Sequence, residues 1–284
     1  MFDNHSGECM KLIKRSLLFT YSMINRILIL FRFQLEYYPL GRDLKELINE
    51  FLTNIRPESQ VKELIRVGSG HAGGYLVPDD LEGIKYCYSP GVSNNSDFED
   101  QLATYGIECF LADYSVDGPA KENPLFQFTK KFLGNKNDSK IIRLETWIKE
   151  NKSDDEMLLQ MDIEGAEYQV ILDTPSETLR KFRILVIEFH GFNNLAHTHS
   201  FDLISTTFYK LLKDFKVVHV HANNSCKSVK IGGFDVPPVM EFTFMRNDSF
   251  IKSEKKIKLP HRLDQKNIPA RKDVDLPRLI LGEK

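Results

Sequence analysis

The sequence has few cysteines, only four in 284 residues, and they stand far apart at Cys9, Cys87, Cys109 and Cys226. No C-x-x-C pair is present, which argues against a zinc ribbon, and the wide separation argues against a framework of disulfides. Cysteine usage of this kind is typical of a reducing compartment. We therefore expect a cytoplasmic protein.

Long apolar runs are missing too, because no stretch reaches the roughly 18 consecutive apolar residues that a membrane-spanning helix needs. The most apolar region, residues 12–33, is interrupted by Asn25 and Arg26 and lacks the small-residue cleavage site of a signal peptide. Three interpretations remain for this segment: a helix packed on the domain or on a partner, a helix that makes a peripheral contact with a membrane surface, or an anchor.

A large excess of either charge is also missing, since 38 Lys and Arg residues face 40 Asp and Glu residues. The net charge of -2 creates no field that would attract a nucleic acid, so none is expected as a partner. A content of 42% hydrophobic and 27% charged residues is ordinary for a soluble globular protein with a sizeable core. No particular oligomeric state is predicted.

Composition and apolar spacing divide the chain into three parts. Residues 1–60 are predicted to be a helical segment, with one amphipathic helix over residues 40–55 that Pro57 ends. Residues 61–250 form the predicted main domain, in which the four glycines of residues 68–80 indicate turn and loop. Residues 251–284 hold ten Lys or Arg against five Asp or Glu and several prolines, which predicts a basic arm, extended or partly disordered.

Within the main domain, near-continuous apolar runs alternate with helical patterns. This alternation predicts an α/β fold: a doubly wound, mostly parallel, seven-stranded Rossmann-like sheet with helices on both faces. The predicted strands are residues 84–89, 107–113, 139–144, 156–163, 183–190, 216–223 and 239–246.

Polar residues follow the predicted strands at their carboxyl ends, the edge where open parallel sheets bind ligands. The densest group comes after residues 156–161, where Asp162, Glu164 and Glu167 place three carboxylates within six residues. Across the sheet the polar residues and glycine at this edge are Ser89, Gly91, Asp113, Asp162, Glu164, Glu188, His190, His219, His221 and Asn223. Their shared position predicts one binding site.

The loop after the first of these strands lacks the G-x-G-x-x-G pattern, because Gly91 is its only glycine. A dinucleotide pyrophosphate needs that double close approach, so nicotinamide and flavin cofactors are disfavoured. Asp113 lies 22 residues after Gly91, where a nucleoside-binding fold places an acid for the ribose hydroxyls. S-adenosylmethionine fits, because it has a ribose, no pyrophosphate and a sulfonium that favours nearby carboxylates.

His219 and His221 stand two apart on one predicted strand, so both side chains point to the same face. Such a pair is more often hydrogen-bonded within the protein or in contact with a substrate. The alternative is a divalent metal held by Asp162, His190 and His221.

Two stretches, "MDIEGAEYQVIL" (residues 161–172) and "ILVIEFHGF" (residues 184–192), resemble the FkbM-type methyltransferases, a branch of the S-adenosylmethionine-dependent class I fold. The resemblance runs in order from Leu64 to the tail, through residues 66–119, 141–148, 217–224 and 259–271. It implies that Ser89, Gly91 and Ser93 line the cofactor's amino-acid end, that Asp113 holds the ribose, and that Asp162 faces both cofactor and acceptor.

The resemblance also implies an acceptor side. Its expected members are Glu164, Glu188 and His190, with His221 and Asn224 closing the pocket and Tyr75 on a lid strand with Gly73 and Gly74. One departure is the first loop, "YSPGVSNN", since class I enzymes carry an acidic residue and two or three glycines there. This leaves the adenosyl contacts less defined than the fold.

Methyl transfer to a hydroxyl requires alignment of the acceptor and removal of its proton. We expect O-methylation of a small-molecule or glycan acceptor, with His190 or His221 as base and with Asp162 and Glu164 beside them. One rival is a metal-dependent hydrolase using Asp162, Glu188, His190, His219 and His221. The other is a non-catalytic methyltransferase-like binding module, attached through its N-terminal helix to a membrane or a partner.

Overall fold

The computed structural model describes Ile24, residues 44–151 and residues 155–282. The segment of residues 12–33, for which a packed, membrane-surface or anchoring helix was expected, therefore lies outside the described residues apart from Ile24. Within the part of the chain that is described, no helix is long and apolar enough to cross a membrane. From Leu44 onward the chain forms one compact unit.

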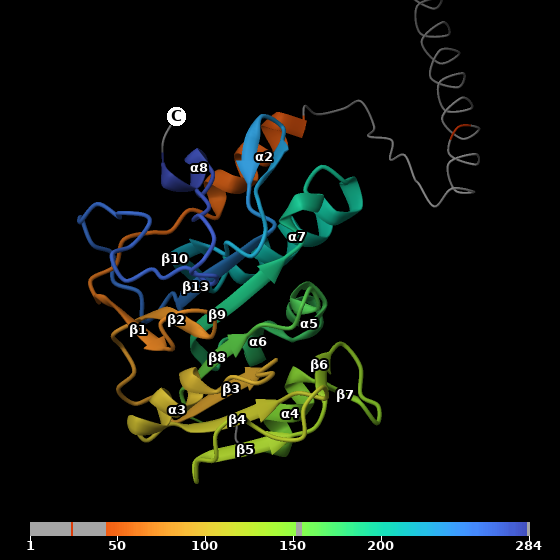
Figure 1. Cartoon of the computed structure of the whole chain (residues 1–284), viewed down its shortest axis with the longest axis vertical. Coiled ribbons are helices and arrows are strands. Elements are labelled where there is room, and N and C mark those ends of the chain that lie inside the picture. The colour runs from red at the N-terminus through yellow and green to blue at the C-terminus, as the bar shows by residue number, and fades with distance from the viewer. Residues whose placement is uncertain (1–23, 25–43, 152–154, 283–284) are drawn as a thin grey trace, which may run out of the picture. The chain divides into compact units, whose positions relative to one another are not determined.

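The centre of this unit is a seven-stranded sheet (Figure 1). In spatial order its strands are β10 (Phe215–Ala222), β13 (Val239–Arg246), β9 (Phe182–His190), β8 (Met157–Met161), β3 (Tyr86–Pro90), β4 (Glu108–Ala112) and β5 (Phe126–Thr129). The four pairs from β9 to β5 are parallel, whereas β13 is antiparallel to both β9 and β10.

The predicted α/β architecture is confirmed, but the sheet is mixed, which corrects the prediction of a mostly parallel sheet. After β10 the chain forms a small hairpin, β11 (Val229–Ile231) and β12 (Phe234–Val236), and then returns as β13 in the opposite direction. The strand expected at residues 139–144 is β7 (Ile141–Arg143), which pairs with β6 (Phe132–Gly134) in a separate two-stranded sheet. The short β5 takes its place in the main sheet.

Helices cover one face of the sheet, and a hairpin with a single helix covers the other. On the first face, α2 (Leu44–Asn54), α4 (Leu144–Glu150), α5 (Glu167–Asp173) and α7 (Thr198–Leu211) pack into a core rich in aromatic residues. On the second face lie α3 (Asp97–Thr104) and the hairpin of β1 (Leu64–Gly68) and β2 (Gly74–Pro78). The remaining short helices are α6 (Ser176–Leu179), η1 (Phe192–Asn194) and α8 (Arg278–Leu281).

Residues 68–80 were predicted as turn and loop from their composition, and the structure has a turn between Gly68 and Gly74 followed by the buried strand β2. A strand at Tyr75 agrees with the lid strand that the resemblance implied. A side chain at Gly74 would place its Cβ 2.0 Å from the carbonyl oxygen of Ser69, so the glycine serves a close backbone approach. Thr243 on β13 donates a hydrogen bond of 2.6 Å to the carbonyl of Leu76 and fixes β2 over the sheet.

The order of the strands defines a switch point between β3 and β8. From β3 the chain continues to β4 and β5 on one side, and it then crosses over to β8 and β9 on the other side of β3. Ligands of doubly wound sheets bind in the crevice outside the carboxyl ends of the strands at such a point. The loops after Pro90 and Met161 lie there (Figure 1).

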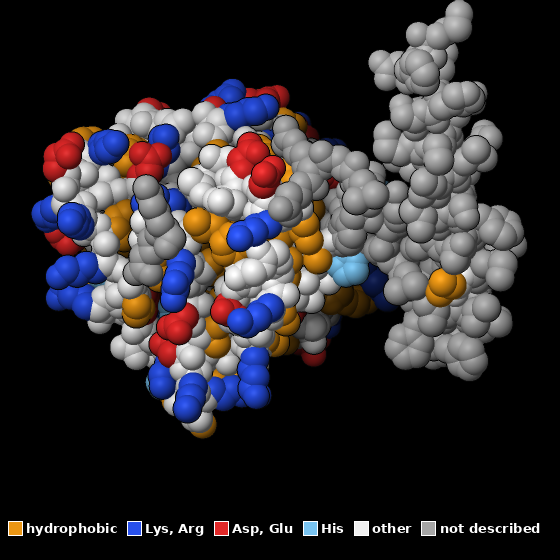
Figure 2. Space-filling view, turned by 90° about the horizontal axis from the view of Figure 1, so that it is seen from above, with side chains coloured by type: hydrophobic (Ala, Val, Ile, Leu, Met, Phe, Trp, Pro, Cys, Tyr) orange, Lys and Arg blue, Asp and Glu red, His pale blue; other side chains and the backbone are white. Residues whose placement is uncertain are grey.

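The end of the molecule that carries α2 and α8 faces the viewer in Figure 2. Lys and Arg side chains are spread over this surface, with hydrophobic side chains exposed between them.

Candidate active site

The turn after β3 touches the turn after β8 through backbone atoms. Gly91 has φ of 87°, and a Cβ built on it would lie 1.7 Å from the carbonyl oxygen of Asp162. No other residue type fits both that conformation and that contact. Ser93 follows with φ of 46°, so the loop that was predicted to hold the cofactor has a tightly specified path.

Asp113, at the end of β4, anchors this loop. Its carboxylate accepts hydrogen bonds from the Ser93 amide (2.8 Å) and from the amide (2.7 Å) and hydroxyl (2.6 Å) of Ser115. A carboxylate offers about four acceptor positions, so roughly one is left for a ligand hydroxyl. Sequence analysis missed Ser115, although Asp-x-Ser is a common pattern of side chain to backbone turns.

The three carboxylates after β8 have different surroundings. Glu167 is completely buried, and its Oε1 accepts hydrogen bonds from the amides of Ile163 (3.1 Å) and Gly165 (3.0 Å). The same oxygen lies 3.2 Å from His190 Nδ1. Glu167 therefore closes the turn and orients the imidazole, a function for which sequence analysis had no signal beyond its place in the acidic group.

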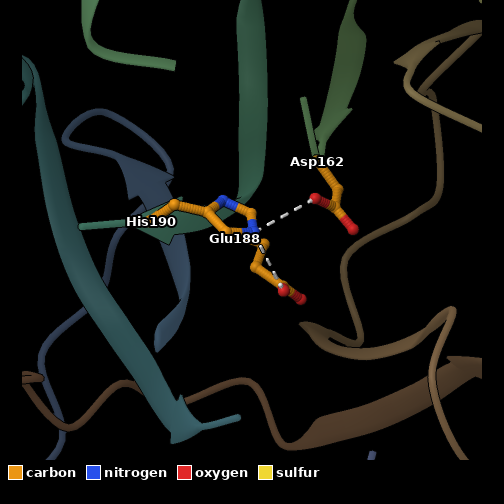
Figure 3. Close-up of side chains that lie close together, drawn as sticks. All are labelled: Asp162, Glu188 and His190. Carbon is orange, nitrogen blue, oxygen red and sulfur yellow. Dashed lines mark ion pairs between the residues drawn. The ribbon is translucent and has the colours of Figure 1, made fainter. Parts of the chain in front are cut away.

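The other ring nitrogen of His190 faces three further carboxylates. Its Nε2 lies 3.9 Å from Asp162 Oδ1, 3.5 Å from Glu164 Oε2 and 3.6 Å from Glu188 Oε1. Figure 3 shows how the imidazole of His190, at the end of β9, points toward Asp162 and Glu188. Glu164 differs in being 87% exposed. The structure thus brings together four residues predicted for the site.

The charges of this cluster are strongly coupled. Burial raises the pKa of Asp162 to about 7, although His190 opposes the rise. Burial and the charge of Asp162 raise the pKa of Glu188 well above its usual range. Burial lowers the pKa of His190, but the hydrogen bond and charge of Glu167 outweigh that, so the pKa is raised overall. A site with so many buried carboxylates favours a proton or a cationic ligand.

Asp162, Glu188 and His190 also form a candidate metal site. One ligand atom from each lies within 4.8 Å of the others. Around an ion with bonds of about 2.0–2.2 Å, tetrahedral ligand atoms lie about 3.4 Å apart, close to the distances seen here. This cluster differs in one member from the predicted set of Asp162, His190 and His221, because Glu188 stands in place of His221.

His221 is turned instead toward Asp264 in the C-terminal arm. Asp264 lies 2.9 Å from His219 Nε2 and 3.8 Å from His221 Nδ1, so both histidines do point to one face. Burial lowers the pKa of His221, but Asp264 and Glu241 outweigh this and raise it to about 9. These partners hold the pKa of Asp264 well below its usual range despite its burial. Sequence analysis missed Asp264 because the arm carries no periodic pattern.

A continuous row of polar side chains crosses the second face at this edge. Its members come from five neighbouring strands: Ser89, Gln160, Glu188, Glu241 and His221. The hydroxyl of Ser89 hydrogen-bonds Gln160 Oε1 at 2.6 Å and also Glu99 of α3. Ser89, predicted to contact the cofactor, thus points under α3, and burial raises the pKa of Glu99 to about 7.

Two predicted acceptor residues have different positions relative to this row. Tyr75 on β2 is buried and packs edge-on against Phe98 of α3, and burial, with the charges of Glu188 and Asp162 added, raises its pKa. Asn224 is pinned to the arm instead. Its amide donates to the carbonyl of Ile268 (3.0 Å) and accepts from the Ile268 amide (2.8 Å).

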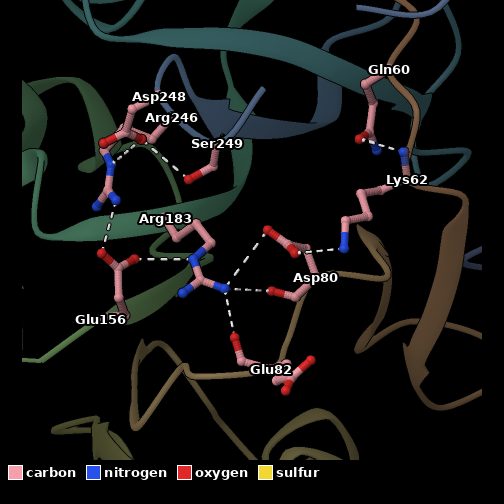
Figure 4. Close-up of polar contacts among 9 residues, drawn as sticks. All are labelled: Gln60, Lys62, Asp80, Glu82, Glu156, Arg183, Arg246, Asp248 and Ser249. Atoms are coloured by element: carbon pink, nitrogen blue, oxygen red, sulfur yellow. Dashed lines mark hydrogen bonds and ion pairs between the residues drawn. The ribbon is translucent and has the colours of Figure 1, made fainter. Parts of the chain in front are cut away.

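The opposite edge of the sheet has a polar cluster of another kind, shown in Figure 4. Arg183 donates to Glu156 (3.0 Å) and to the backbone carbonyls of Asp80 (3.0 Å) and Glu82 (2.7 Å). Arg246 completes it with a bond of 2.8 Å to Glu156. These cations and carboxylates neutralise one another, so this edge stabilises the contacts between strands and loops. At the carboxyl edge, by contrast, the carboxylates outnumber the cations.

The model of the FkbM methyltransferase domain matches residues 58–213. This match spans more than half of the 284 residues. The chain belongs to the FkbM methyltransferase domain family. It is a methyltransferase by family, and the resemblance inferred from its sequence is confirmed. A comparison with curated proteins yields no match.

The matched region contains most of the candidate site of this FkbM methyltransferase. It begins before β1 and ends after α7, so it includes the loop at Gly91, Asp113, the acidic turn and His190. β10, β13 and the C-terminal arm lie beyond it. The contacts of His221 with Asp264 therefore lie outside the matched region.

Proposed function

We propose that the protein catalyses S-adenosylmethionine-dependent O-methylation of a hydroxyl on a small-molecule or glycan acceptor. The observation that supports this best is the position of His190. The buried carboxylate of Glu167 orients its ring, and its Nε2 faces Glu188 as well as Asp162 and Glu164 of the turn that contacts the loop at Gly91.

The residues around the switch point suit the cofactor. Gly91 holds the loop against the turn after β8, and Asp113 is fixed with about one acceptor position open for a ribose hydroxyl. Asp162 Oδ1 is buried without a hydrogen-bond partner, and a cationic ligand would satisfy it. When bound, S-adenosylmethionine supplies an electrophilic methyl group next to these residues.

His190 is the better of the two expected bases. A group whose pKa is about 9, such as His221, is protonated at neutral pH and has no lone pair for a proton. Glu167 at Nδ1 places the basic lone pair of His190 on Nε2, among Asp162, Glu164 and Glu188. Asp162 and Glu188 then position the hydroxyl. A divalent ion held by Asp162, Glu188 and His190 would instead lower the pKa of the hydroxyl directly.

The hydrolase hypothesis has less support, because its five residues fall into two groups. Asp162, Glu188 and His190 form one cluster, and His219 and His221 bind Asp264 in another. The binding-module hypothesis also has less support, because a non-catalytic module does not need an imidazole that is oriented as Glu167 orients His190. A cytoplasmic location agrees with the free thiols of Cys87 and Cys109, which lie side by side on β3 and β4.

The test is calorimetric titration with S-adenosylmethionine and S-adenosylhomocysteine, followed by transfer of a labelled methyl group to a panel of polyols and methyl glycosides. We expect micromolar binding that Asp113→Ala abolishes and that Asp117→Ala, a change of an exposed acid, leaves intact. We also expect transfer that His190→Ala removes. Absence of binding would refute the cofactor assignment, and binding without transfer to any hydroxyl would refute O-methylation.

A further inference from the structure

Two extended segments lie against the edge of the sheet. Residues 56–62 and residues 251–258 run side by side as two extended segments, here called the basic ribbon. The Val61 amide donates to the Ile251 carbonyl (2.9 Å), and the Ser253 amide donates to the Ser59 carbonyl (2.9 Å). The Glu58 amide donates to the carbonyl of Val217 on the edge strand β10 (2.7 Å), so the ribbon is fixed to the sheet.

The ribbon carries six basic residues, Arg56, Lys62, Lys252, Lys255, Lys256 and Lys258, against two acids, Glu58 and Glu254, although the whole chain has a net charge of -2. A groove of about 640 Å³ along it is lined by five basic residues: Arg56, Lys252, Lys255, Lys256 and Lys258. The acidic residue in its lining is Glu58, whose Oε1 forms an ion pair with Lys216 Nζ at 2.8 Å. Lys255 pairs with Glu63, but the described residues offer Lys252, Lys256 and Lys258 no carboxylate partner.

Exposed aliphatic side chains accompany these lysines. Ile251 is 62% exposed, Val61 53% and Ile257 38%, and the first two are neighbours across the ribbon. Ile257 and Leu259 also line the groove, together with Ile280 of α8. Exposed aliphatic side chains and unpaired lysines therefore share one surface.

We propose that the basic ribbon is a docking surface for an anionic lipid membrane. Lysines at such a surface attract the headgroups, while short aliphatic side chains enter the boundary between headgroups and acyl chains. Single-stranded nucleic acids pair basic residues with exposed aromatic rings instead, and the exposed apolar residues of this ribbon are all aliphatic. The surface is distinct from the N-terminal segment, for which membrane contact was expected from sequence.

The experiment is co-sedimentation of the full chain with vesicles of phosphatidylcholine, with and without phosphatidylserine. Each lysine near an anionic lipid surface changes the binding constant by about fivefold. The triple variant Lys252→Gln, Lys256→Gln, Lys258→Gln is thus expected to bind the anionic vesicles roughly a hundredfold more weakly. Ile257→Ser is expected to weaken binding without changing its salt dependence. The matched control removes three exposed lysines elsewhere, in Lys85→Gln, Lys213→Gln, Lys230→Gln, and should bind like the wild type.

Five outcomes decide between these possibilities. Binding that depends on phosphatidylserine and is lost in the ribbon variant but not in the control supports the proposal. No binding to anionic vesicles overturns it, as does an equal loss in both variants. A loss only when Lys11, Lys14 and Arg15 are changed to Gln assigns the contact to the N-terminal segment and overturns it. Binding of single-stranded DNA or polyglutamate by a protein that ignores vesicles also overturns it and makes the ribbon a polyanion site.

Discussion

Glu167 and His190 form a carboxylate and imidazole pair, with Glu167 Oε1 3.2 Å from His190 Nδ1 and the carboxylate wholly buried. Because the same oxygen accepts two backbone amides, it cannot move away from the ring without opening the turn after β8. The pair therefore fixes both the orientation of His190 and the nitrogen that remains available.

Glu167→Gln is expected to lower the rate of methyl transfer by about 10²-fold, the scale of general base catalysis. The base must be unprotonated, and its pKa is raised above 6.5, so the wild-type rate should still be rising with pH above 6.5. Loss of the Glu167 charge lowers that pKa and moves the acidic limb of the pH profile to lower pH. The control is Glu177→Gln, an exposed carboxylate on α6 that makes no contact with His190. Equal profiles for the two variants would contradict the assignment.

Gly91→Ala is expected to cost several kcal/mol of stability and to abolish cofactor binding, because its Cβ would meet the Asp162 carbonyl and because φ is 87°. Thermal unfolding and calorimetry with S-adenosylhomocysteine measure the two effects. Gly118→Ala, where a Cβ has open space, should change neither. A Gly91→Ala protein that binds like the wild type would mean that this loop has room to move.

Any divalent cation that the site takes is expected to be held by Asp162, Glu188 and His190. Titration with Mn²⁺, followed by calorimetry or by the electron paramagnetic resonance signal of the free ion, should show a loss of binding in Glu188→Gln. His221→Gln should retain it. The reverse pattern would restore the ligand set expected from sequence.

The contact of Asp264 with His221 makes stability depend on pH. The folded pKa of His221 is about 9 against an ordinary 6.5, so its contribution is full below pH 6.5 and is lost as the pH rises through 9. The pKa of Asp264 is lowered, so its contribution is present above its ordinary 3.8 and is lost in acid. Asp264→Asn should therefore destabilise the protein more at pH 6 than at pH 9, by about 2 kcal/mol. Denaturant unfolding at the two pH values tests this, and an equal cost at both would rule it out.

The sequence was sufficient to predict the elements whose patterns are local. β3, β4, β8, β9, β10 and β13 all coincide with predicted apolar runs, since continuous burial leaves a signal in composition. The composition of residues 68–80 indicated loop, and β2 was expected only from the family resemblance, because Gly74 serves a close backbone contact rather than a turn. The antiparallel direction of β13 was not predicted, because an apolar run does not show whether a strand runs parallel or antiparallel to its neighbours.

The site was predictable to the extent that strand ends converge on one edge. That rule placed Asp162, Glu164, Glu188 and His190 together, and they lie together. It placed His221 with them as well, although the register of β10 with β13 sets it beside Glu241 and next to the arm. The contacts of the C-terminal arm depend on how this irregular segment folds back onto the domain. They leave no periodic pattern in the sequence, so they could not be predicted from it.

The insertion of β13 between β9 and β10 has a consequence for the growing chain. During synthesis β10 leaves the ribosome before β13, yet its place in the sheet exists only once β13 has paired with β9. β10, which carries His219 and His221, therefore stays unpaired until β13 has been synthesised as far as residue 246. A chain released early would expose the edge of β9, so the carboxyl-terminal strand decides whether a nascent molecule becomes an enzyme or a seed for aggregation.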